Sequence, residues 1–187
     1  MWVKICGITR YEDASAAFEA GADAIGIVLT TSRRKADPLA VQSWIHTIKG
    51  MEKVGVFMDE DPGYIAETAS MLGLTAVQLH TTFREEHKLL LDRFNIILAF
   101  NNLEQAVIPE GFPGRLLLDA SIGSGTTCTW KRYDRPFILA GGLEPGNVRE
   151  AIRQASPFGV DVSTGVEISP GIKDKDKIRR FIQEAKT

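Results

Sequence analysis

The sequence has little that would suit an extracellular, membrane or nucleic-acid-binding protein. Only Cys6 and Cys128 carry thiols among its 187 residues, too few for a disulfide framework or a zinc cluster. No apolar run approaches the roughly 20 residues of a membrane helix, and the first residues do not form a signal peptide. The 22 basic and 24 acidic residues leave no charge excess to attract nucleic acid or a membrane surface. We therefore expect a cytoplasmic protein with neither kind of partner.

The composition is typical of a globular protein, with 44% apolar and 25% charged residues. The length is enough for one well-packed domain and too short for two ordinary ones. Since no linker or low-complexity tract divides the chain, we expect a single domain over residues 1–187.

Short apolar runs rich in β-formers alternate with segments of helical spacing. Most of these runs are continuously apolar, which is typical of parallel strands buried on both faces. The eight runs are Trp2–Cys6, Ala24–Leu29, Lys53–Met58, Ala76–Leu79, Asn95–Phe100, Arg115–Asp119, Phe137–Ala140 and Gly159–Val162.

Helix signals separate most of these runs. Asp37-Pro38 and Asp61-Pro62 each pair a preferred N-cap residue with proline at the first helical position. We expect further helices from Tyr11 to Gly21, from Glu144-Pro145 to Ala155, and from Lys173 to Lys186, and only one or two turns at 103–108 and 130–134.

Eight strands with helical crossovers fit either a doubly wound open sheet or a closed barrel. Eight strand–helix repeats with short connections favour the closed form, a (β/α)8 TIM barrel of the α/β class. Such barrels typically have about 250 residues, so this one must be compact, with shortened helices around strands five and six.

In a barrel of this kind, the active site lies at the C-terminal ends of the strands. The residues there include a thiol, a basic cluster, an imidazole, carboxylates and two loops of small residues. In chain order they are Cys6, Ser32–Lys35, His80, Asp119, Gly141–Gly142 and Asp161–Gly165.

The loops after strands seven and eight are the usual phosphate site of these barrels. Glycine lets backbone N–H groups approach an anion closely, so Gly141 and Gly142, with Ser163, Thr164 and Gly165, predict a phosphate cradle. Gly-Gly alone is equally compatible with a tight turn. The segment 123–127 could add donors or could simply be a loop.

The other side chains allow both structural and catalytic interpretations. Cys6 could be a small buried hydrophobe, and Asp119 could cap its own loop. Across one pocket, however, a thiol and a carboxyl could act as base and acid. Arg33 and Arg34 are either surface charges or clamps for a substrate carboxylate, and His80 taken alone is most simply a structural histidine.

Several motifs together resemble the phosphoribosylanthranilate isomerase family of tryptophan biosynthesis, over nearly the whole length. The matching blocks are Lys4–Thr9, Glu12–Ala14, Glu19–Gly26, Val54–Phe57, Val77–His80, Leu116–Asp119, Ala140–Val148, Val160–Glu167 and Pro170–Asp174.

The resemblance implies an Amadori rearrangement of N-(5-phosphoribosyl)anthranilate, a small phosphorylated substrate. Cys6 matches the general base and Asp119 the general acid. Arg34 matches the arginine that faces the anthranilate carboxylate, and His80 and Asp161 match further substrate-binding positions. Gly141, Gly142, Ser163, Thr164 and Gly165 match the phosphate cradle. Neither a metal nor a cofactor is implied, and the chain would act as a monomer or a homodimer.

Two alternatives stay open at this point. One is a barrel isomerase of another phosphorylated sugar, although the related histidine-pathway isomerase has an aspartate where this chain has Cys6. The other is a non-catalytic protein that binds phosphate ligands. Its support is the loop after Asp119, where Thr126–Trp130 replaces the lysine and the Phe-Asp-Trp run usual in the family.

Overall fold

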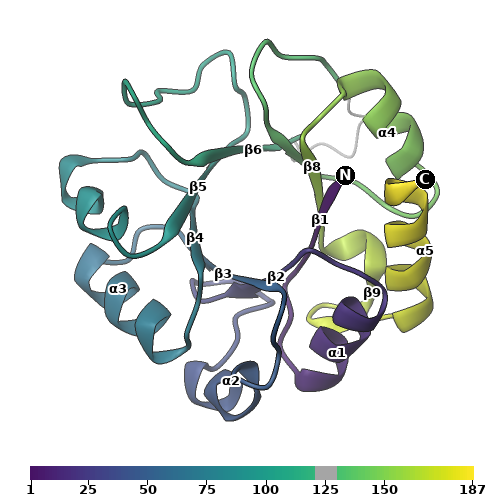
Figure 1. Cartoon of the computed structure of the whole chain (residues 1–187), viewed down its shortest axis with the longest axis horizontal. Helices are drawn as coiled ribbons and strands as arrows, with labels where there is room; N and C mark the ends of the chain where they lie inside the picture. The colour runs from purple at the N-terminus through teal and green to yellow at the C-terminus, as the bar shows by residue number, and fades with distance from the viewer. Residues whose placement is uncertain (121–129) are drawn as a thin grey trace.

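Eight parallel strands close into a barrel (Figure 1). A computed structural model describes residues 1–120 and 130–187. Each strand pairs with the next in the sequence, and β8 pairs with β1. The strands are β1 (Trp2–Cys6), β2 (Ala24–Val28), β3 (Glu52–Phe57), β4 (Ala76–Leu79), β5 (Asn95–Phe100), β6 (Arg115–Asp119), β7 (Ile138–Ala140) and β8 (Gly159–Val162). The expected TIM barrel is confirmed, and each predicted run matches a strand to within one residue at either end.

Helices cover the outside of most of the barrel. They are α1 (Tyr11–Glu19), α2 (Pro38–Ile45), α3 (Pro62–Met71), α4 (Val148–Ala155) and α5 (Lys175–Lys186). The two predicted N-caps are confirmed. Asp37 accepts a hydrogen bond from the Leu39 N–H, and Asp61 accepts from Gly63 and Tyr64. These caps satisfy N–H groups that the first helical turn leaves without a partner.

The outer layer is reduced further than expected around strands five and six. A 3-10 helix, η1 (Glu85–Leu90), precedes β5, and the segment 101–114 between β5 and β6 contains no helix. A turn at 103–106, in which the Ala106 N–H donates to the Leu103 carbonyl at 3.4 Å, matches the turn expected at 103–108. The described residues that lead into β7, 130–137, contain neither a turn nor a helix, so the turn expected at 130–134 is absent. Figure 1 shows extended loops here instead of coiled ribbons. Phe83 and Phe112 pack at 5.4 Å between ring centroids and help to cover the strands.

Two predicted helix starts are wrong. α4 begins at Val148, because Glu144–Asn147 forms a turn in which the Asn147 side chain accepts from the Glu144 N–H. α5 begins at Lys175, since Lys173 belongs to a small antiparallel hairpin of β9 (Glu167–Ser169) and β10 (Ile172–Lys173). A one-turn 3-10 helix, η2 (Thr164–Val166), links β8 to this hairpin.

The strands separate two apolar regions. Val3 and Ile5 belong to the large core between strands and helices. Trp2 packs against a smaller cluster of strand residues, including Ala24, and Cys6 packs with Val28 and Val56 near the strand ends. Because side chains alternate along a strand, Trp2, Lys4 and Cys6 share the inward face of β1.

Within the described residues, no helix has the length and apolar character needed to cross a membrane.

Candidate active site

A pocket of about 560 Å³ opens at the C-terminal ends of the strands. All ten predicted site residues line it. These are Cys6, Arg34, His80, Asp119, Gly141, Gly142, Asp161, Ser163, Thr164 and Gly165. They come from six separate parts of the chain, and the barrel closure brings them together. Arg33, the other arginine considered, is exposed and does not line the pocket.

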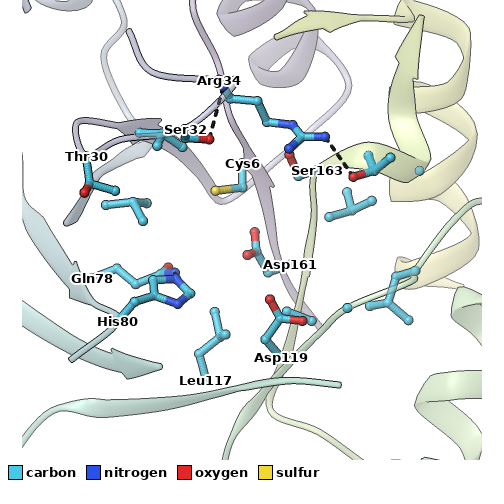
Figure 2. Close-up of a pocket in the computed structure, with 18 of the residues that line it drawn as sticks. Cys6, Thr30, Ser32, Arg34, Gln78, His80, Leu117, Asp119, Asp161 and Ser163 are labelled. Carbon is cyan, nitrogen blue, oxygen red and sulfur yellow. Dashed lines mark hydrogen bonds between the residues drawn. The ribbon is translucent and has the colours of Figure 1, made fainter. Parts of the chain in front are cut away.

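Cys6 is the last residue of β1, and its sulfur points into the pocket (Figure 2). The residue is 8% exposed, with Val28 and Val56 beside it. This burial raises the pKa of the thiol, because an apolar site disfavours the thiolate. The positive charges of Lys4 and Lys173 act in the opposite direction without cancelling the effect. A reactive thiolate here therefore depends on nearby cations.

Asp119 ends β6 and approaches the pocket from another side. In Figure 2, Cys6 and Asp119 both point toward the cavity, and Asp161 lies between them in this view. Asp161 comes from β8 and forms an ion pair with Lys4, at 2.9 Å between Nζ and Oδ1. The pocket thus presents a thiol and carboxyl groups to one space, which is the arrangement that acid–base chemistry requires.

His80 lies on the wall formed by the end of β4. Its Nε2 is 2.7 Å from Nε2 of Gln78, two residues earlier in the chain. Burial lowers the pKa of His80, and the charge of Lys4 lowers it further. A neutral imidazole can both donate and accept hydrogen bonds, so His80 suits the binding of hydroxyl groups.

Arg34 reaches the pocket from the loop after β2. Its Nε and Nη2 donate to the two carboxylate oxygens of Glu167, each at 2.8 Å, and Nη2 also donates to Thr164 Oγ1 at 3.0 Å. Lys173 Nζ donates to Glu167 at 2.9 Å and to Ser163 Oγ at 3.3 Å. Burial opposes the charge on Glu167, but these donors hold its pKa at about 2.

The two loops predicted to bind phosphate lie side by side. Gly141 and Gly142 both have positive φ, 88° and 66°, a conformation that favours glycine. Asn147 holds their loop by donating to the Gly142 carbonyl at 2.9 Å. Gly165 passes so close to the Leu143 carbonyl oxygen that a Cβ atom there would collide with it. Glycine therefore allows the two loops to meet at one edge of the pocket.

Four residues around this site were not predicted. Lys4 and Gln78 point into the barrel, and Glu167 and Lys173 form a buried ion pair beside the pocket. For Lys4, a charged residue inside an apolar run was an available signal. Nothing local in the sequence indicated that Glu167 and Lys173 would pair, because the hairpin that joins them was not predicted.

Some expectations fall on residues that are not described. The segment 123–127 and Cys128 both lie outside the described residues. Among the residues that are described, no group of three or more His, Cys, Asp or Glu side chains could hold a metal ion.

Comparison with known proteins identifies the family of this chain. The sequence model of the N-(5′-phosphoribosyl)anthranilate (PRA) isomerase family matches residues 3–184. The chain belongs to this family. The PRA isomerase of Geobacter sp. (strain M21) is 39% identical, over 98% of this chain and 97% of its own length.

Solved PRA isomerase structures share the fold. The Thermotoga maritima enzyme superposes with a TM-score of 0.87 at 38% identity, covering 100% of this chain and 98% of its own. A second PRA isomerase structure, with a TM-score of 0.82 at 36% identity and the same coverage, contains reduced 1-(o-carboxyphenylamino)-1-deoxyribulose 5-phosphate. A third describes monomers generated from the dimeric Thermotoga maritima enzyme, at a TM-score of 0.82 and 35% identity, again with the same coverage.

Proposed function

We propose that Cys6 and Asp119 are the base and the acid with which this chain carries out the reaction of its family. That reaction is the Amadori rearrangement of N-(5′-phosphoribosyl)anthranilate to 1-(o-carboxyphenylamino)-1-deoxyribulose 5-phosphate, in tryptophan biosynthesis. The observation that carries the assignment is the convergence of all ten predicted side chains and glycines on one pocket, in a chain that belongs to the family.

The first step opens the ribose ring. Asp119 donates its proton to the ring oxygen, the bond from C1′ to that oxygen breaks, and the anthranilate nitrogen supplies the electron pair that forms a C1′–N double bond. The resulting Schiff base makes the hydrogen on C2′ acidic. General acid catalysis of this kind contributes about 10²–10⁴-fold.

The second step removes the C2′ proton. The thiolate of Cys6 accepts it, and the electron pair of the broken C–H bond moves through C1′ to the nitrogen and gives an enolamine. Transfer of the C2′ hydroxyl proton to C1′ then yields the ketone. A thiolate near the pH of the cell is well suited as base, provided that nearby cations stabilise it.

The two anionic ends of the substrate define where the ribose lies. The phosphate binds to Gly141, Gly142, Ser163, Thr164 and Gly165, and Arg34 pairs with the anthranilate carboxylate. His80 and Asp161 line the wall between these ends and contact the ribose hydroxyls. The chemistry is supplied by side chains alone, so the reaction proceeds without a metal or cofactor.

The physiological setting follows from the same family. We infer a cytoplasmic enzyme formed by one barrel domain that acts as a monomer or homodimer on a small phosphorylated substrate. The dimer of the Thermotoga maritima relative supports the second form. A sugar-phosphate isomerase with aspartates in both catalytic positions is the weaker alternative, because Cys6 occupies one of them.

The test is the decay of phosphoribosylanthranilate fluorescence with purified protein. The wild-type chain should convert the substrate, and Cys6→Ser should lower kcat by about 10²-fold or more, because a hydroxyl is a far weaker base than a thiolate. Cys128→Ser, which changes the only other cysteine of the sequence, is the matched control and should retain turnover. Equal rates for Cys6→Ser and wild type would remove Cys6 from the mechanism.

A further inference from the structure

Lys4 occupies an unusual position for a lysine. It lies in the middle of β1, on the inward face, two residues before Cys6. Its exposed fraction is 0%, so the whole side chain is enclosed by the barrel. An ammonium group in such a place loses its hydration, which is costly unless partners replace the water.

The neighbours of Lys4 are set by strand register. Lys4 is the register partner of Asp161 on β8, and Cys6 is the register partner of Gly26 on β2. Asp161 Oδ1 lies 2.9 Å from Lys4 Nζ. A Cβ atom built on Gly26 would come within 2.8 Å of Cys6 Sγ and 3.1 Å of Lys4 Nζ. Gly26 therefore leaves the space in which the sulfur and the ammonium lie close together.

The ammonium remains charged in this setting. Burial works against the charge, but Asp161 and Cys6 outweigh it and raise the pKa of Lys4 above its ordinary value. For stability alone the pair has little value, because replacing a buried ion pair with well-packed apolar residues is often neutral or stabilising. The charged ammonium of Lys4 next to the sulfur of Cys6 therefore indicates a role in the reaction of Cys6 rather than in stability.

We propose that Lys4 is a positioning residue that stabilises the thiolate of Cys6 from inside the barrel, and that Asp161 keeps Lys4 charged and fixed in place. The inference rests on the proposed function only in treating Cys6 as the base. Lys4 lies below the pocket rather than among its lining residues, so it acts through Cys6.

Other charged groups also face the thiol from the surrounding elements. Asp161 opposes the thiolate, Lys173 favours it, and Lys4 has the largest effect of the three. In the described part of the chain, Arg34 also interacts with the sulfur electrostatically, and His80 and Asp119 face it from the lining of the same pocket.

The test measures the thiol without substrate. Alkylation of Cys6 by iodoacetamide is followed against pH, with the modified peptide quantified by mass spectrometry, because only the thiolate reacts. Lys4→Met, which keeps the length of the side chain and removes its charge, should move the midpoint upward by about one pH unit or more. Alkylation below the midpoint should therefore be about tenfold slower.

Two comparisons separate this effect from damage to the fold. Lys173→Met removes another buried cation, whose partner is Glu167, and should move the midpoint less than Lys4→Met does. In turnover assays, kcat/KM of Lys4→Met is measured as a function of pH. The pH range over which kcat/KM rises should move upward with KM nearly unchanged, so that alkaline pH restores activity. A purely structural lysine would give neither the shifted range nor the recovery.

The outcomes distinguish the two proposals. An unchanged alkylation midpoint in Lys4→Met would overturn the role of Lys4 and leave that of Cys6 intact. If the midpoint shifts in Lys4→Met but the wild-type protein does not convert phosphoribosylanthranilate, the role of Lys4 is supported and the proposed function is overturned. If Lys4→Met does not fold, Lys4→Gln keeps a polar group at the site and is measured in the same way.

Discussion

Glu167 accepts two hydrogen bonds from Arg34, at 2.8 Å each, while its Oε1 also accepts one from Lys173 at 2.9 Å. A guanidinium held by two parallel bonds has a fixed plane and direction. Lys173 also donates to Ser163, which belongs to the proposed phosphate cradle. One carboxylate therefore connects the two ends of the site that bind the negative charges of the substrate.

Glu167→Gln should raise KM more than it lowers kcat. The amide cannot hold Arg34 and Lys173 by charge, so Arg34 would meet the substrate carboxylate in a less defined orientation. We expect KM to rise by about tenfold in steady-state kinetics, from a loss of about 1.4 kcal/mol of binding. Arg34→Ala should raise KM at least as much. An unchanged KM in both variants would mean that other groups bind the carboxylate.

The ion pairs of Glu167 should also make the stability of the folded protein depend on pH in the acid range. The pKa of Glu167 is about 2 in the folded protein, below its ordinary value of 4.5. The contribution is therefore fully present above pH 4.5 and is lost as the pH falls toward about 2. The difference in Tm between wild type and Glu167→Gln should stay constant from pH 8 to 5 and shrink below about 4.5. A constant difference through the acid range would contradict the ion pairs described.

Asp119→Asn should leave binding nearly intact and reduce turnover. An amide has a similar size and can donate a hydrogen bond, but it cannot deliver a proton to the ring oxygen. We expect kcat to fall by about 10²–10⁴-fold with a small change in KM. Loss of affinity with retained kcat would instead assign Asp119 to binding.

Gly165→Ala tests the close contact between the two phosphate loops. The new methyl group would collide with the backbone of Leu143 and Glu144, which cannot move aside as a flexible side chain can. We expect weaker competitive inhibition by inorganic phosphate and a loss of stability of about 1–3 kcal/mol. Gly21→Ala is the control, since Gly21 has φ 88° but no atom near its missing Cβ. It should lower Tm and leave phosphate inhibition unchanged.

Sequence periodicity was sufficient for the barrel, and caps were sufficient for two helices. Asp37-Pro38 and Asp61-Pro62 combine two independent preferences at each site, so local chemistry alone determined where α2 and α3 begin. Glu144-Pro145 carried a similar signal, but the Asn147 side chain stabilises a turn there, and α4 begins three residues after the proline. Whether such a segment forms a helix or a turn depends on its place in the fold and cannot be decided from the neighbouring residues alone.

The site shows the same division between local and distant causes. Cys6, Asp119 and the glycine loops could be predicted because strand ends in a barrel point to one mouth. Glu167 and Lys173 were missed as partners because β9 and β10 had no recognisable alternation, and the charged composition of 173–186 suggested one continuous helix. Lys4 was missed as a functional group because its meaning comes from Asp161, 157 positions later on the adjacent strand.

The loop-covered side of the barrel has a consequence for how the fold tolerates change. Between β5 and β6, the segment 101–114 covers the strands without a helix, and aromatic rings such as Phe83 and Phe112 provide part of the packing. Both rings are partly buried against the large core, on a flank where 101–114 forms no helix. Sequence drift on this flank is therefore constrained by ring size at a few positions rather than by helix propensity over many.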